Sequence, residues 1–193
     1  MSKKTKIKQQ LRIVGGKWKG RKLTFPNNQD LRPTLSRTRE TLFNWLRPSI
    51  LNSSCLDLFA GSGALGFEAM SQGASTLTCV EKDRDAFQNI RKQAVLLEAE
   101  ITSFHGDAIE FLELTDENFD IAFLDPPYSQ PHLIERALSV ILKKNLIKHF
   151  LYIEVLSLGQ LKELETKFFI RLLKSSKNGV GQSTLFDLKS RTI

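Results

Sequence analysis

The chain has 193 residues, of which 41% are hydrophobic and 25% charged, and its formal net charge is +7. This composition is typical of a folded domain and excludes a mainly disordered chain, because Leu, Ile, Val and Phe recur throughout. No apolar run approaches the roughly 18 residues that a membrane span needs, and the basic N-terminus lacks the apolar stretch of a secretory signal, so we expect a cytoplasmic protein with no membrane partner.

Positive charge is concentrated in the first quarter of the chain. Residues 1–47 have a net charge of +11, whereas the remainder has a net charge of −4. From Arg12 onward basic and apolar residues are interleaved and glycines mark turns, which favours a small basic β-structure over a solvated tail. Such a surface attracts a polyanion, most commonly nucleic acid. The candidate contacts are Arg12, Lys17, Trp18, Lys19, Arg21, Lys22, Arg32, Arg37 and Arg39, with a core position as an equal alternative for Trp18.

The segment 34–46 predicts a helix that leads from this basic region into the rest of the chain. Its apolar residues, such as Leu42 and Phe43, would pack inward, while Arg37 and Arg39 would stay on a polar face. We expect a basic extension over residues 1–47 and a second domain over residues 48–193.

The second domain alternates strand and helix patterns. The strands are expected at 55–60, 76–81, 101–105, 119–125 and 149–155, and the helices at 63–73, 83–97, 107–113 and 130–142. This alternation predicts an α/β fold with a doubly wound, mostly parallel sheet. Two further strands, at 167–173 and 183–188, predict an antiparallel hairpin added at one edge.

A glycine loop follows the first of these strands. Asp57 lies in the strand, and Gly61 and Gly63 lie in the turn before the helix. Glycine lets the backbone approach a ligand closely, and a helix N-terminus offers free N–H groups, although many tight turns need glycine for geometry alone. Glu81 comes 18 residues after Gly63, a spacing that suits hydrogen bonds to the ribose of a nucleotide-like cofactor. Asp107, after the third strand, could meet an adenine.

The tetrapeptide Asp125-Pro126-Pro127-Tyr128 ends an apolar strand, and it suits methylation of an amino group. An amine conjugated to a base ring is a poor nucleophile because its lone pair is delocalised. The Asp125 side chain and the Pro126 carbonyl can accept its two hydrogens and so aim the lone pair at a methyl donor, while Tyr128 offers a face for the base. A simple turn is the alternative interpretation.

These motifs, in this order, resemble a class I S-adenosylmethionine-dependent amino-methyltransferase. The blocks RIVGGKWKGRKL, LRPT, RTRETLFNWL, CLDLFAGSGALGFEA and FLDPPY together resemble the RsmD family, which methylates the exocyclic amino group of one guanine in 16S ribosomal RNA. The resemblance implies a Rossmann-like methyltransferase fold, S-adenosylmethionine as cofactor, and a small-subunit assembly particle as substrate. The implied cofactor residues are Asp57, Phe59, Gly61, Ser62, Gly63, Glu81, Lys82, Asp107, Ala108 and Asp125, and the implied catalytic residues are Asp125, Pro126, Pro127 and Tyr128.

Two other classes of protein remain open. A DNA adenine or cytosine amino-methyltransferase would share the tetrapeptide but usually adds a sizeable target-recognition region. A non-catalytic RNA-binding assembly factor could keep the fold without the reaction. The three histidines have no metal-ligand spacing, so no metal is expected, and Cys55 and Cys79 fit buried thiols of a reducing compartment.

Overall fold

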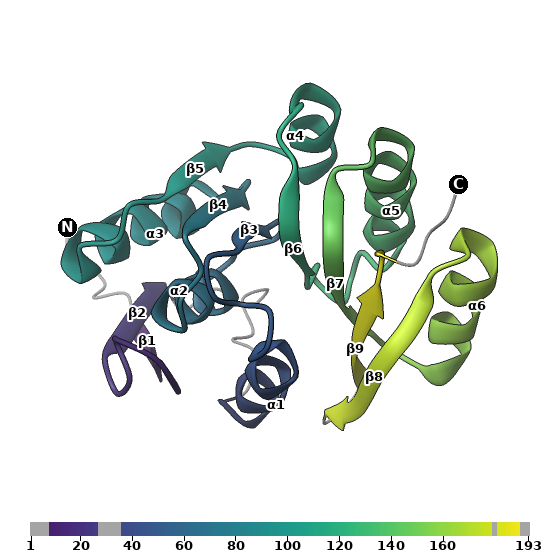
Figure 1. Ribbon diagram of the computed structural model, residues 1–193. Helices are drawn as coiled ribbons and strands as arrows, with labels where there is room; N and C mark the ends of the chain where they lie inside the picture. The colour runs from purple at the N-terminus through teal and green to yellow at the C-terminus, as the bar shows by residue number, and fades with distance from the viewer. Residues whose placement is uncertain (1–7, 27–35, 179–180, 190–193) are drawn as a thin grey trace.

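The computed structural model describes residues 8–26, 36–178 and 181–189. Its centre is a seven-stranded sheet in the order β5-β4-β3-β6-β7-β9-β8 (Figure 1). Strands β3 to β7 are parallel, and β9 and β8 are antiparallel additions beside β7. The strands are β3 (Ser54–Asp57), β4 (Thr76–Glu81), β5 (Thr102–His105), β6 (Phe119–Leu124), β7 (Ile147–Val155), β8 (Arg171–Asn178) and β9 (Gly181–Asp187).

Helices cover both faces of the sheet. One face carries α1 (Ser36–Leu46), α2 (Ala64–Ser71) and α3 (Arg84–Leu97), and the other carries α4 (Ala108–Leu114), α5 (His132–Lys144) and α6 (Leu158–Phe168). Successive strand residues point to opposite faces, so Cys55 joins the first core and Leu56 the second. This layering explains why the strands read as continuous apolar runs.

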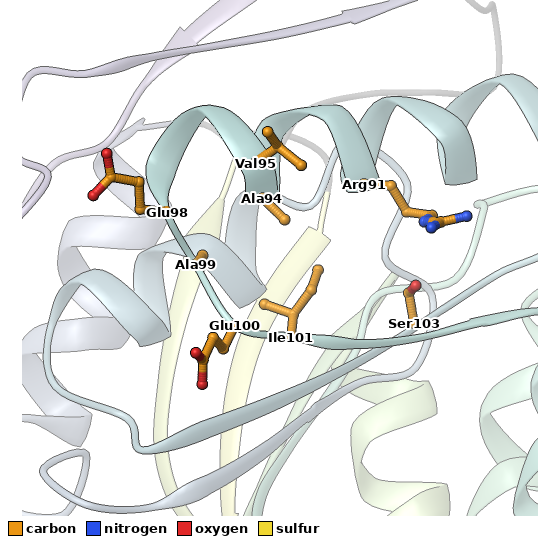
Figure 2. A pocket seen from close by; sticks show the side chains of 8 residues that line it. All are labelled: Arg91, Ala94, Val95, Glu98, Ala99, Glu100, Ile101 and Ser103. Atoms are coloured by element: carbon orange, nitrogen blue, oxygen red, sulfur yellow. The ribbon is translucent and has the colours of Figure 1, made fainter.

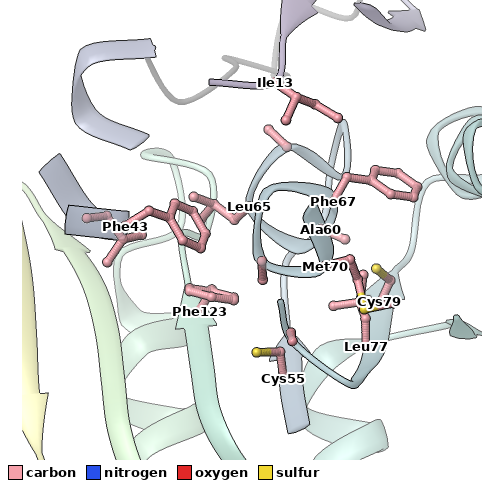
Figure 3. Close-up of a cluster of buried hydrophobic side chains, with 14 of the residues drawn as sticks. Ile13, Phe43, Cys55, Ala60, Leu65, Phe67, Met70, Leu77, Cys79 and Phe123 are labelled. Carbon is pink, nitrogen blue, oxygen red and sulfur yellow. The ribbon is translucent and has the colours of Figure 1, made fainter. Parts of the chain in front are cut away.

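A separate two-stranded sheet precedes α1. It pairs β1 (Lys8–Arg12) with β2 (Lys22–Pro26) in antiparallel register. The apolar side of this hairpin region lies against α2, where Ile13 meets Leu65 and Phe67 in one buried cluster (Figure 3). Gly16 has a φ of 74°, and a Cβ there would lie 1.8 Å from the Ser71 carbonyl oxygen, so glycine is required.

Hydrogen bonds also join the hairpin to α2 and α3. The Lys17 N–H donates to the Ser71 carbonyl at 2.8 Å, and the Trp18 N–H donates to Ser71 Oγ at 2.9 Å. The Asn89 side chain on α3 donates to the Thr24 carbonyl at 2.7 Å. Residues on both sides of the expected boundary at position 47 therefore share one core, while the division into two functional domains stays a prediction.

The structure confirms the doubly wound sheet, the basic hairpin and the C-terminal antiparallel pair. The start of the strand expected at 167–173 is wrong. Helix α6, which was not expected from the sequence, occupies Leu158–Phe168. Ser157 caps it by accepting from the Gln160 N–H, and Leu161 lies on its buried side. Phe169 ends the helix with a φ of 51°, and the strand begins only at Arg171.

None of the helices in the described part of the chain is long and apolar enough to cross a membrane. Within the same residues, no three His, Cys, Asp or Glu side chains gather as a metal site. Cys55 and Cys79 are both buried as free thiols, and burial raises the pKa of Cys55 to about 12.

Candidate functional site

The carboxyl ends of β3 and β6 lie side by side where the order of the sheet reverses. Strand β3 pairs with β4 on one side and with β6 on the other. Just past the paired residues, the Leu58 N–H donates to the Phe123 carbonyl at 3.1 Å. The helices that follow β3 and β6 leave toward opposite faces, and doubly wound sheets bind ligands in the crevice at such a point. The glycine loop and the tetrapeptide both begin at this point.

The glycine loop is held against the end of β4. The Gly61 N–H donates to Glu81 Oε2 at 2.7 Å, and the Ala60 N–H donates to the Val80 carbonyl at 3.0 Å. Gly61 and Gly63 have φ values of 53° and 77°. A Cβ on Gly63 would come within 2.7 Å of the Phe67 ring. The loop therefore needs glycine for its backbone conformation and for its packing on α2.

Glu81 bridges the glycine loop and the start of α3. Its Oε2 accepts from Gly61, and its Oε1 accepts from the Asp83 N–H at 2.7 Å. Burial raises the pKa of Glu81, and these hydrogen bonds oppose that shift. The structure thus brings Glu81 directly to the glycine loop.

Asp57 lies beneath the loop rather than at its surface. Its side chain is 2% exposed, and Oδ2 accepts from the Gly66 N–H in the first turn of α2 at 3.0 Å. Burial raises the pKa of Asp57 to about 7, and the nearby Glu81 carboxylate adds to this while the hydrogen bond opposes it. In this position Asp57 fixes α2 to β3.

The remaining predicted cofactor residues surround this core of the site. Asp107 is exposed and caps α4, because Oδ1 accepts from the Ile109 N–H at 2.9 Å and from the Glu110 N–H at 3.3 Å. Lys82 is exposed, and Phe59 is half-buried against the second core. Ser62 and Ala108 are buried.

The tetrapeptide follows β6 directly. Asp125 is half-buried and Pro126 is buried, and the Pro127 carbonyl accepts from the Gln130 N–H at 2.8 Å. The Tyr128 hydroxyl donates to Glu154 Oε2 at 3.3 Å. Glu154 lies near the end of β7, the strand next to β6. Glu154 was not expected in the site from the sequence, where only its position near a strand end indicates it.

The predicted nucleic-acid residues fall into two groups. Arg12, Lys17, Lys19, Arg21, Lys22 and Arg37 are exposed, and Arg32 lies outside the described residues. Trp18 is 8% exposed and Arg39 is 1% exposed. The expectation that Arg39 stays on a polar surface is therefore wrong, because its guanidinium pairs with the buried Glu68. Trp18 belongs to the core, the alternative that its sequence left open.

A family model described as conserved hypothetical protein 95 matches residues 11–187. The chain belongs to this family, the RsmD family. Ribosomal RNA small subunit methyltransferase D of Haemophilus influenzae is 38% identical over 188 residues, which cover 93% of this chain and 94% of that protein. Its Escherichia coli K12 counterpart is 46% identical over 127 residues, which cover 65% of this chain and 64%, just under two thirds, of that protein.

Solved structures of similar proteins have the same fold. The structure of yhhF from Escherichia coli, described as a candidate methyltransferase, is 35% identical with a TM-score of 0.82 and covers 93% of this chain and 98% of that one. A methylase candidate from Haemophilus influenzae, HI0767, is 33% identical with a TM-score of 0.72 over the same shares. The sequence resemblance to the RsmD family is confirmed.

The structure also has an open pocket of about 560 Å³ where α3 ends and β5 begins (Figure 2). The side chains of Arg91, Val95 and Ile101 line it, together with others from the same two segments. Helix α3 begins near the glycine loop, at the carboxyl ends of the strands, and runs toward their amino ends. The pocket at the end of α3 therefore lies toward the amino ends of the strands. None of the predicted RsmD-family site residues lines it.

Proposed function

We propose that this protein transfers a methyl group from S-adenosylmethionine to the exocyclic amino nitrogen of one guanine in 16S ribosomal RNA, within a small-subunit assembly particle. The observation that carries the proposal is the hydrogen bond from Leu58 to Phe123, which puts the glycine loop and the tetrapeptide at one crevice. The name that the relatives carry supports ribosomal RNA as the substrate class. A cytoplasmic location follows from that substrate.

The chemistry of the crevice fits S-adenosylmethionine. The backbone at Gly61 and Gly63 has no side chain to keep a ligand away, and the Glu81 carboxylate beside it is a suitable acceptor for ribose hydroxyls. Asp107 offers a second, exposed carboxylate at the end of β5, on the side of β4 away from β3. When bound, the cofactor supplies an electrophilic methyl group.

The tetrapeptide prepares the nitrogen that receives this group. The Asp125 carboxylate and the Pro126 carbonyl accept the two hydrogens of the guanine amine, which directs its lone pair away from them. As the nitrogen–carbon bond forms, the sulfur–methyl bond of the donor would break and leave a neutral thioether, and the nitrogen would lose one proton, which Asp125 would accept. Tyr128 holds the base by stacking against its face. Alignment therefore supplies most of the rate enhancement.

The basic hairpin would hold the RNA. Its exposed cations, among them Lys17, Lys19 and Lys22, are carried on a hairpin region that hydrogen bonds fix to the C-terminal ends of α2 and α3. Phosphate groups attract such a surface and repel the remainder of the chain, which is net negative.

The test is methyl transfer by the wild-type protein and by Asp125→Ala. We expect the wild type to label 16S RNA in small-subunit particles at a guanine amino group, and the variant to lose about 100- to 1,000-fold in rate while still binding the cofactor. Preferential labelling of DNA would favour the DNA methyltransferase class. Cofactor binding without any transfer would favour a non-catalytic assembly factor, and near-normal turnover of the variant would contradict the role of Asp125.

A further inference from the structure

Both tyrosines of the chain contact one buried carboxylate. The sequence contains two tyrosines, Tyr128 and Tyr152. The Tyr128 hydroxyl donates to Glu154 Oε2 at 3.3 Å, and the Tyr152 hydroxyl donates to Glu154 Oε1 at 2.6 Å. Glu154 is 7% exposed. Each oxygen of this carboxylate therefore accepts a hydrogen bond from a different tyrosine.

The Tyr152 side of this arrangement is anchored in the sheet. Tyr152 lies on β7 and is fully buried, and its ring makes an edge-type contact with Phe123 on β6, with the ring centroids 6.4 Å apart. Its hydroxyl oxygen also lies 3.2 Å from Ser183 Oγ on β9. Burial and the charges of Glu154 and Asp125 raise the pKa of Tyr152 well above its ordinary value, so the hydroxyl remains a donor. Glu154 is thus held from the interior of the molecule.

The Tyr128 side of the arrangement reaches the tetrapeptide. Tyr128 is half-buried and follows two prolines, which restrict the backbone before it. The bond to Glu154 ties the hydroxyl end of the ring to β7, the strand beside β6. Backbone restriction at one end and the hydrogen bond to a carboxylate at the other fix the position of the ring's long axis, from Cβ to the hydroxyl oxygen.

We propose that Glu154 is a positioning residue, which fixes the ring of Tyr128 against which the target base lies. The inference rests on the proposed function, since it requires a base at Tyr128. Reactions that depend on alignment are sensitive to small displacements of the groups that orient the substrate. Removal of the Glu154 bond would free the Tyr128 ring while every group that touches the amine stays in place.

The contact itself can be tested without activity. Protein labelled with ¹³Cζ-tyrosine has two tyrosine resonances, which Tyr128→Phe assigns. We expect Glu154→Gln to shift both resonances, because both hydroxyls lose a charged acceptor. The matched control is Glu163→Gln, the same change at an exposed position on α6, which should shift neither. An unchanged Tyr128 resonance in Glu154→Gln would contradict the proposal.

Kinetics then test whether the contact matters for the reaction. We expect Tyr128→Phe and Glu154→Gln each to lower kcat about tenfold with an unchanged KM for S-adenosylmethionine. The double variant should fall no more than about twofold below the slower single variant, because both changes remove the same bond. Fully additive losses would mean that Glu154 acts independently of Tyr128 and would overturn the inference. Tyr128→Phe keeps the test valid if Glu154→Gln fails to fold.

The two proposals fail in different ways. If the wild type transfers no methyl group, or Asp125→Ala remains fully active, both the proposed function and the role of Glu154 are contradicted. If Asp125→Ala is inactive but Tyr128→Phe has wild-type kcat, only the inference about Glu154 is overturned.

Discussion

Arg39 Nε lies 3.7 Å from Glu68 Oε2, and the two side chains are 1% and 0% exposed. Glu68 also accepts from the Val14 N–H at 2.9 Å and the Gly15 N–H at 2.8 Å, while Arg39 Nη2 donates to the Arg12 carbonyl at 2.6 Å. One buried ion pair therefore joins α1, the hairpin and α2. Burial lowers the pKa of Arg39, and the charge of Glu68 opposes this, so each charge depends on the other.

Removal of this carboxylate should destabilise the whole domain. Glu68→Ala leaves the buried Arg39 guanidinium without its carboxylate partner and removes the acceptor of two part-buried backbone N–H groups. We expect a loss of about 3–5 kcal/mol in the free energy of unfolding, measured by urea denaturation. Glu113→Ala, at an exposed position on α4, should change it by less than about 0.5 kcal/mol. Equal stability of the two variants would mean that the pair contributes nothing.

Asp57 should make stability depend on pH. Its pKa is raised to about 7 in the folded protein, above its ordinary value of 3.8. The folded chain then binds a proton that the unfolded chain has released, so this contribution is fully present below about pH 4 and is lost as pH rises toward 7. We expect Asp57→Asn to stabilise the protein more at pH 8 than at pH 5, measured by urea denaturation at both values. A difference that does not change with pH would contradict the raised pKa.

Glu81 should govern binding of the cofactor. Glu81→Ala removes the proposed acceptor for the ribose and also frees the Gly61 N–H that it holds. We expect a loss of roughly 1.5–3 kcal/mol in binding free energy for S-adenosylmethionine by calorimetry. Glu81→Gln, which keeps an acceptor oxygen, should lose less. Binding to ribosomal particles should change little. Unchanged cofactor affinity in Glu81→Ala would contradict the assignment of the cofactor site to this crevice.

The hairpin lysines should govern binding of RNA. Lys17→Glu, Lys19→Glu and Lys22→Glu together should raise the Kd for the particle and flatten its salt dependence. The log–log slope should fall by about 0.7–0.9 for each phosphate that these lysines no longer neutralise. Arg21 is best left intact, because its Nη2 donates to the Leu96 carbonyl at 2.7 Å and helps to hold the hairpin on α3.

A matched triple variant distinguishes a local effect from one of net charge. Lys143→Glu, Lys162→Glu and Lys177→Glu make the same charge change at exposed positions on α5, α6 and β8. We expect this control to keep the wild-type salt slope, with cofactor affinity unchanged in both triple variants. Identical particle binding by the two triple variants would leave no docking role for the hairpin.

The local sequence alone predicted most of the elements and the motifs of the site. Strand β4 was predicted at its observed bounds, 76–81, because β-branched and apolar residues, which favour strands, follow one another from Thr76 to Val80. The glycine loop and the tetrapeptide were predictable because glycine and proline restrict the backbone locally. Helix α6 was missed, since only two of its leucines, Leu161 and Leu164, are buried and its apolar pattern is weak.

The tertiary structure decided which charges are buried and which residues share them. Arg39 and Glu68 are 29 positions apart, and nothing in the spacing of either indicates that they form a buried pair. The same holds for Glu154 and Tyr128, whose hydrogen bond depends on β7 lying beside β6. Burial of a polar group becomes favourable only when its partners are brought to it from other elements, and that information is absent from any local stretch of sequence.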